Sequence, residues 1–252
     1  MTTHNAAFTS LFTQELAADL QQIIRLHDRE LDAETVAALQ AVDFPHNLAL
    51  LPVDDMGLAA QQLMQECLPQ ISAPTTPPPL DVLAADFAAI YLTAAHGTSP
   101  YESVWVLDER LTAQQPMFEW REIYKKDQLE VGNWRARYDD HIVLEMQWLA
   151  HRLLKTPENW QETAHLLDEH LLFWLPDWAA RVQARADTAF YVALAGLSLS
   201  WLRRFRQLLA EHFALAIPER ASIAEKIRLK YKAEREQTAP IKFMPGAQGP
   251  SW

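Results

Sequence analysis

The 252-residue sequence is poor in glycine and holds a single cysteine. Its 6 glycines are too few for a turn-rich barrel, and neither G-x-G-x-x-G nor G-x-x-x-x-G-K-[ST] occurs. Because Cys67 has no second cysteine, neither an intrachain disulfide nor a thiolate metal cluster can form. The composition therefore argues against sheet-rich folds and against the common phosphate-binding loops.

Long apolar runs are also missing. The N-terminal residues lack a basic stretch followed by an apolar one, so we expect no export signal. No uncharged apolar run approaches the ~18 residues that span a bilayer. The length allows one large domain or two small ones, and 49% apolar with 22% charged residues is ordinary for a globular protein. We expect a cytoplasmic protein with no integral membrane segment.

The charge is unevenly distributed. The formal net charge is −11, yet residues 203–252 carry ten Lys/Arg against five Asp/Glu, which leaves −16 on residues 1–202. An acidic body disfavours nucleic acid and favours cationic partners such as an arginine-bearing peptide. Solubility alone also explains an acidic surface, and that alternative stays open.

Apolar residues recur at helical spacing along the chain, beginning with Phe12, Leu16, Leu20 and Ile23. The pattern predicts further helices over residues 33–42, 56–68, 80–95, 116–130, 139–154 and 187–215. No stretch alternates apolar and polar residues for long enough to predict a strand. We therefore expect an all-α protein with roughly ten helices.

Capping and breaking residues refine this expectation. Thr156 is a candidate N-cap with Pro157 at the first helical position, and Pro176 predicts a helix break. We expect one helical domain over residues 1–217, in which residues 72–80 form a Pro-rich loop. Residues 218–252 should form a basic helix followed by a mobile tail.

Asp140, His141 and Glu145 invite a catalytic or metal-binding interpretation, because His141 and Glu145 lie four residues apart on one helix face. A helical metal-dependent hydrolase using His141 and Glu145 is therefore an alternative function. The simpler interpretation is that Asp139 or Asp140 caps an amphipathic helix. A third possibility is an adaptor whose basic tail docks a partner.

Two segments resemble one known family. The segment "SPYESVWVLDERL" (99–111) is similar to a proline–aromatic–x–Ser–Val–aromatic motif. The segment "YDDHIVLEMQWLAHRL" (138–153) is similar to a helix start with an acidic–Asp–His motif. Both motifs are those of the TorD/DmsD/NarJ family of molybdoenzyme maturation chaperones. Segments 86–92, 170–182 and 189–197 support the resemblance, and the order and spacing of all five segments match the family over residues ~10–215. Ile90 and Tyr91 depart from the usual Leu-Phe, which leaves the client open.

The resemblance implies a TorD/DmsD-like helical bundle without enzymatic activity. Family members bind the twin-arginine signal peptide, or another region, of the apo catalytic subunit of a molybdenum-cofactor oxidoreductase in the cytoplasm. They assist cofactor insertion and delay export. Cofactor contact would be transient, with the molybdenum cofactor or a guanine nucleotide, and the protein would be a monomer or homodimer.

A twin-arginine signal peptide has an arginine pair beside an apolar segment. We therefore expect its receptor to present carboxylates and aromatic side chains. His141 would add pH sensitivity, since the neighbouring Asp140 favours the protonated imidazole. Tyr101 and Trp105 are alternatively plain core residues. The predicted client-binding residues are Asp86, Phe87, Ile90, Tyr91, Pro100, Tyr101, Glu102, Ser103, Trp105, Asp140 and His141.

Overall fold

The computed structural model describes residues 8, 10–133, 136–155 and 160–237. Its described residues form helices and no strand, so the predicted all-α fold of roughly ten helices is confirmed. The helices are α1 (Ser10–Asp28), α2 (Ala33–Ala41), α3 (Asp55–Cys67), α4 (Pro79–Phe87), α5 (Ser103–Val106), α6 (Gln115–Lys126), α7 (Ile142–Lys155), α8 (Trp160–Glu169), α9 (Leu171–Arg185), α10 (Ala189–Phe213) and α11 (Arg220–Gln237), together with a 3-10 helix η1 (Leu68–Ser72) and a π-helix η2 (Ala88–Leu92).

The chain divides into two compact units. The first ends at Pro218 and the second, which contains α11, begins at Glu219. The Pro-rich segment between η1 and α4 lies within the first unit. No helix in the described part of the chain is both long enough and apolar enough to cross a membrane.

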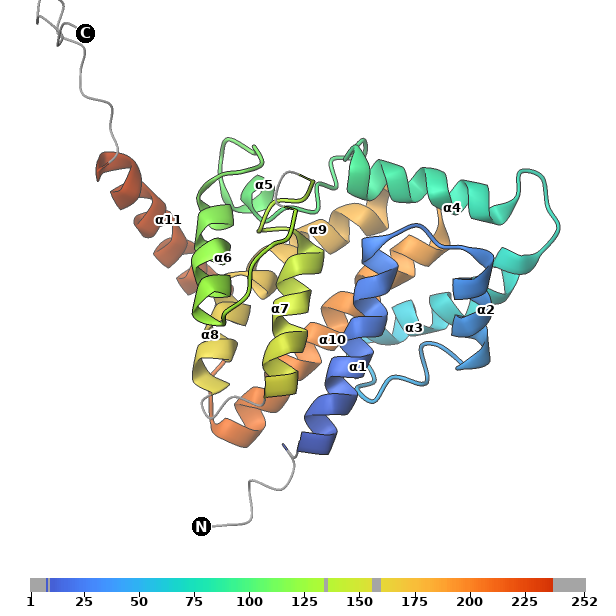
Figure 1. Ribbon diagram of the computed structural model, residues 1–252, viewed down its shortest axis with the longest axis horizontal. Helices are drawn as coiled ribbons and strands as arrows, with labels where there is room; N and C mark the ends of the chain where they lie inside the picture. Colours follow the sequence, from blue (N-terminus) through green and yellow to red (C-terminus); the bar gives the residue numbers. More distant parts are fainter. Residues whose placement is uncertain (1–7, 9, 134–135, 156–159, 238–252) are drawn as a thin grey trace, which may run out of the picture. The chain divides into compact units, whose positions relative to one another are not determined.

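Helix α10 lies at the centre of the first unit and packs against α3 and α9 (Figure 1). Its run of apolar and small residues is buried over most of its length. Two glycines let the backbones of α3 and α10 approach each other closely. A Cβ at Gly196 would lie 2.8 Å from Ala60 Cβ, and one at Gly57 would lie 2.1 Å from Ser200 Oγ. Side chains at either position would push α3 away from α10.

Helix α1 packs against α7, and its predicted apolar stripe faces inward. Leu16, Leu20 and Ile23 are completely buried, whereas Phe12 at the start of the helix is half-buried. The 3.6-residue period therefore identified the packing face of this helix from sequence.

Pro176 does not break a helix, contrary to the sequence prediction. It lies inside α9, which runs on to Arg185. Proline lacks the N–H that would bond to the carbonyl four residues earlier, and this normally destabilises a helix interior. Here Trp174, Leu175 and Trp178 are buried around it, and this packing outweighs the missing hydrogen bond.

The helix predicted over residues 80–95 is shorter than expected and changes from an α-helix to a π-helix along its length. α4 ends at Phe87 and continues as the π-helix η2, in which Thr93 N donates to Ala88 O at 2.9 Å across five residues. The helical winding ends at Leu92, and Ala94 adopts φ 50°. A residue in the left-handed region ends a helix because the chain after it leaves the right-handed helical path.

Two predictions lie outside the described residues. The candidate cap Thr156 and first-turn residue Pro157 precede the described start of α8. The tail beyond Gln237, which was predicted to be mobile, is likewise outside them.

Candidate functional site

The two motif segments, 99–111 and 138–153, lie side by side. Tyr101 and His141 form an isolated antiparallel bridge. Glu102 N donates to Asp140 O at 2.9 Å, and Ile142 N donates to Pro100 O at 2.9 Å. The start of α5 and the start of α7 are therefore fastened together by backbone hydrogen bonds.

Asp140 caps α5 rather than the helix that follows it. Its Oδ2 accepts hydrogen bonds from Ser103 N at 2.9 Å and from Ser103 Oγ at 2.5 Å. Burial raises the pKa of Asp140 to about 6; the two Ser103 hydrogen bonds oppose that shift and the charge of Glu102 adds to it. The expectation that Asp139 or Asp140 caps the helix over 139–154 is wrong, because α7 begins at Ile142 and Asp140 faces α5.

His141 supplies the cap of α7. Its Nδ1 accepts from Val143 N at 3.1 Å, so the neutral tautomer carries its proton on Nε2. Burial holds the pKa of His141 well below its usual range, and the charge of Arg137 lowers it further. The expectation of a protonated His141 is therefore wrong, because desolvation outweighs the neighbouring Asp140.

A buried polar cluster lies behind the bridge. Glu102 Oε2 accepts from Trp120 Nε1 at 2.7 Å, and Oε1 accepts from His170 Nδ1 at 2.9 Å. Glu145 accepts from Trp174 Nε1 at 3.1 Å. Burial raises the pKa of Glu145 well above its usual range, and the Glu102 charge raises it further. This cluster ties α5, α6, α7 and α9 together.

The metal-hydrolase alternative is not favoured by this geometry. His141 and Glu145 share a helix face, yet they bond to different partners, the α7 backbone and the Trp174 indole. Among the described residues, neither belongs to a group of three or more possible metal ligands.

The predicted residues of α4 and η2 lie at a different place in the fold. Asp86 caps α10, accepting from Thr188 N at 2.9 Å and from Thr188 Oγ1 at 2.6 Å. Phe87 and Ile90 are buried, and Tyr91 lies between them and His27, with its hydroxyl 2.6 Å from His27 Nδ1. These side chains do not join the bridged motifs.

Of the eleven predicted client-binding residues, only Tyr101 and Trp105 keep substantial exposed surface. The Tyr101 ring lies edge-on to the His141 ring at 4.9 Å between centroids, and Trp105 Nε1 donates to Ser99 O at 2.7 Å. The remaining nine are buried. Client contact by any of the eleven stays a prediction.

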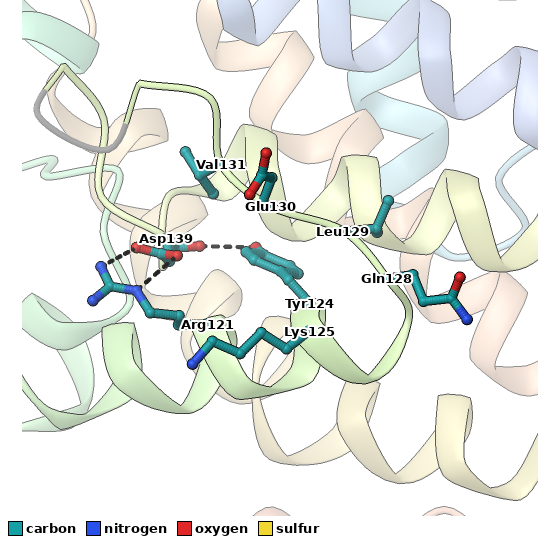
Figure 2. A pocket seen from close by; sticks show the side chains of 8 residues that line it. All are labelled: Arg121, Tyr124, Lys125, Gln128, Leu129, Glu130, Val131 and Asp139. Carbon is teal, nitrogen blue, oxygen red and sulfur yellow. Dashed lines mark hydrogen bonds and ion pairs between the residues drawn. The ribbon is translucent and has the colours of Figure 1, made fainter.

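A cavity of about 560 Å³ opens between α6 and the segment that leads into the second motif (Figure 2). On one wall, Arg121 Nη2 donates to Asp139 Oδ2 at 2.8 Å and Tyr124 Oη donates to Asp139 O at 2.8 Å. A second hollow of about 230 Å³ shares part of the lining. The residues around the larger cavity are Arg121, Tyr124, Lys125, Gln128, Leu129, Glu130, Val131 and Asp139.

Sequence reasoning missed this cavity as a site. Its only signal was Asp139, the acidic residue directly before Asp140 and His141 in the second motif. The cavity combines the carboxylates of Asp139 and Glu130, the cationic side chains of Arg121 and Lys125, and the apolar side chains of Leu129 and Val131. Its carboxylates and apolar side chains are the groups that a peptide with cationic and apolar side chains would contact.

Comparisons with known proteins agree with the motif resemblance. Residues 54–180 match the family model described as "Nitrate reductase delta subunit". The chain is 32% identical over 181 residues to "Chaperone protein TorD" of Actinobacillus pleuropneumoniae serotype 7, covering 70% of this chain and 86% of the relative. It is 28% identical over 205 residues to the TorD chaperone of a Psychrobacter species, covering 77% and 91%.

Proposed function

The chain belongs to the family of TorD chaperones and nitrate reductase delta subunits, and from that premise we propose that it binds the twin-arginine signal peptide of a molybdenum-cofactor oxidoreductase subunit. Its relatives are named chaperones and not enzymes, and the chain is a maturation chaperone of this kind. The proposed client is the apo catalytic subunit, held ready for cofactor insertion and kept from export until the cofactor is in place.

One observation carries the proposal. The two motifs that resemble the family meet at the Tyr101–His141 bridge, and the 560 Å³ cavity ends at Asp139, two residues before that bridge. All of these residues fall within the segment 54–180 that matches the family model. A ligand in the cavity would therefore touch the chain next to both motifs.

The chemistry of the cavity fits a leader peptide. A client guanidinium offers two parallel donors to a carboxylate, as Arg121 already does to Asp139. We infer that a client arginine exchanges with Arg121 on Asp139 while Glu130, which is exposed, receives the second arginine. Leu129 and Val131 then face the apolar part of the leader.

The buried residues have a supporting role in this proposal. Asp140 and His141 fix the starts of α5 and α7, and Glu102 joins those helices to α6 and α9. In this role they keep Asp139 in place. Tyr101 and Trp105 remain available at the surface for further client contact.

The same function has consequences for the cofactors that the protein contacts and for the compartment in which it acts. We expect no stably bound cofactor, and only transient contact with the molybdenum cofactor or a guanine nucleotide during client loading. Action on a leader before export requires a cytoplasmic protein. We expect a monomer or a homodimer.

Titration calorimetry with a synthetic twin-arginine leader tests the proposal. The peptide should bind, the affinity should fall as salt rises, and replacing both arginines by lysine should weaken binding because lysine lacks the planar fork. Asp139→Asn and Glu130→Gln should each weaken binding about tenfold, which corresponds to ~1.4 kcal/mol.

Glu66→Gln is the matched control. Glu66 is an exposed acidic residue on α3 whose carboxylate accepts from Gln62, and neither residue lines the cavity. It removes the same charge and should leave the affinity within about twofold. No binding at all, or equal losses in all three variants, would contradict a leader site in this cavity.

A further inference from the structure

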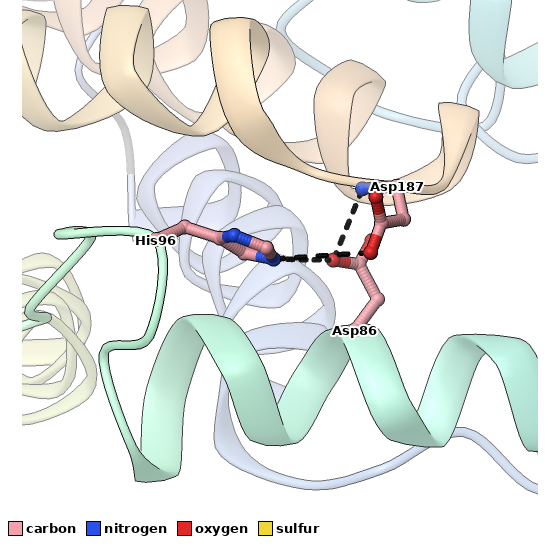
Figure 3. Close-up of side chains that lie close together, drawn as sticks. All are labelled: Asp86, His96 and Asp187. Atoms are coloured by element: carbon pink, nitrogen blue, oxygen red, sulfur yellow. Dashed lines mark hydrogen bonds and ion pairs between the residues drawn. The ribbon is translucent and has the colours of Figure 1, made fainter.

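Three potential metal ligands converge on one point away from the bridged motifs. Asp86 comes from α4, His96 from the loop after η2, and Asp187 from the turn before α10 (Figure 3). His96 Nε2 lies 3.9 Å from Asp86 Oδ1 and 3.9 Å from Asp187 Oδ2. Within the described residues, this is the only group of three such side chains whose ligand atoms all lie within 4.8 Å of one another.

The ligand atoms have unused bonding capacity. His96 Nε2 is shielded from solvent and has no hydrogen-bond partner, although the ring points at both carboxylates. Asp86 Oδ2 accepts both hydrogen bonds from Thr188, whereas Oδ1 accepts only Asp187 N at 3.2 Å. A buried nitrogen without a partner is costly unless something binds it.

We propose that Asp86, His96 and Asp187 bind a divalent transition-metal ion, with Zn²⁺ as the best fit. Imidazole nitrogen together with carboxylate oxygens is a common zinc ligand set, with bond lengths of ~2.0–2.2 Å. Tetrahedral geometry at those lengths separates ligand atoms by ~3.4 Å. The two separations from His96 need to close by about half an ångström, and the Asp86 and Asp187 ligand atoms lie within 4.8 Å of each other. Water takes the fourth position.

The residues around the group allow an ion to enter and the three ligands to move closer to it. The Asp187 side chain is 75% exposed, so an ion reaches the group from solvent on that side. Asp86 is held by its hydrogen bonds to Thr188. His96 sits in a loop between Ala94 at φ 50° and Gly97 at φ 67°, so the closing movement falls on this loop and on the exposed Asp187.

A bound ion would join three segments that are distant in sequence. The His96 loop leads directly to Thr98, whose carbonyl accepts from Trp178 Nε1 at 2.9 Å, and then into the first motif at Ser99. Holding His96 against α4 and the start of α10 would fix the position of the loop that leads into the first motif. In this role the ion acts as a clamp between the three segments.

Calorimetric titration of chelator-treated, untagged full-length protein with ZnCl₂ tests the proposal. We expect one ion per chain, and Co²⁺ substitution should give the visible absorption of a tetrahedral site. His96→Gln and Asp187→Asn should each weaken binding at least tenfold. Asp86 is left unchanged because it caps α10.

His46→Gln is the matched control, since His46 forms an exposed pair with Asp43 at 3.4 Å without a third ligand in the described residues. It should bind zinc like the parent protein. Circular dichroism checks that each variant is folded, and zinc should raise the melting temperature of the parent but not of His96→Gln. Absence of binding, or undiminished binding by folded His96→Gln, would overturn the site.

Discussion

His27 is a completely buried imidazole that remains neutral. Ser198 Oγ donates to Leu194 O at 2.7 Å, so it accepts from His27 Nε2, 2.7 Å away. His27 Nδ1 then accepts from the Tyr91 hydroxyl at 2.6 Å. Burial lowers the pKa of His27 to about 3 from its ordinary value of 6.5. Both ring nitrogens are thus satisfied only in the neutral form.

This pKa makes the fold acid-sensitive. The unfolded chain takes up a proton on His27 below pH ~6.5, whereas the folded chain does so only near pH 3. The free energy of unfolding should therefore fall as pH drops from ~6.5 towards 3, by up to ~5 kcal/mol from this residue. His27→Gln should be less stable at pH 7 but lose less on acidification. Urea unfolding over a pH series measures both, with the exposed His46→Gln as control; parallel curves for parent and His27→Gln would refute the assignment.

Asp140 shifts stability in the opposite direction. Its pKa is raised to about 6, so the folded protein holds a proton that the unfolded chain releases near pH ~4. Its contribution to the free energy of unfolding should decline as pH rises from ~4 to ~6, by up to ~3 kcal/mol. Asp140→Asn keeps an oxygen for Ser103 and removes the titration, so its stability should decline less over this interval. The same urea series decides: an unchanged slope would mean that Asp140 is ionised throughout.

At the scale of single elements, α10 ends at an alanine in an unfavourable conformation. Ala214 follows Phe213 with φ 53° and ψ 36°, the left-handed region in which alanine is strained and glycine is not. This strained residue changes the direction of the chain at the end of α10. The cost should be measurable by substitution.

Ala214→Gly should raise the free energy of unfolding by about 1 kcal/mol, because it relieves the backbone strain at the helix end. The same substitution four residues earlier, Ala210→Gly inside α10, should lower it by about 1 kcal/mol, since glycine disfavours a helix interior. Denaturant unfolding of both variants gives the two signs. A loss of stability in Ala214→Gly would show that the side chain contributes more packing than strain.

Periodicity predicted the helices well and only some of their ends. The helices over 33–42, 56–68 and 187–215 agree with α2, α3 and α10 to within about two residues. The misses have local causes that residue patterns do not carry. Pro176 is overridden by burial of its neighbours, and the helix after Pro79 changes winding at Ala88.

For the molecule as a whole, one core connects the helices of the first unit. The buried apolar cluster extends from Phe8 to Leu209 and includes no residue of α11. The first unit therefore contains its own core, as a domain that folds alone must.

A chain truncated after Pro218 should keep a single cooperative unfolding transition, with a melting temperature within a few degrees of the full chain. The reason is that the apolar cluster remains complete. Thermal melts followed by circular dichroism make the comparison. Loss of cooperativity would show that residues 219–252 are needed to complete the fold.

The candidate site was only partly predictable from sequence, because its contacts are long-range. The two motifs were identified together, and the bridge between Tyr101 and His141 joins them. Burial of Glu102 was not predictable, since its partner His170 lies 68 residues away. The cavity beside Asp139 depends on how α6 meets a loop that carries no motif.

The π-helical turn η2 has a consequence for how this sequence can vary in length. A turn closed across five residues, as between Thr93 and Ala88, holds one residue more than an α-helical turn. Deleting one residue there would restore regular winding and rotate everything upstream by ~100° relative to everything downstream. Tyr91 and Asp86 could not then both keep their partners, His27 and Thr188. An alignment gap inside η2 would therefore mark a homologue that has lost one of these two anchors.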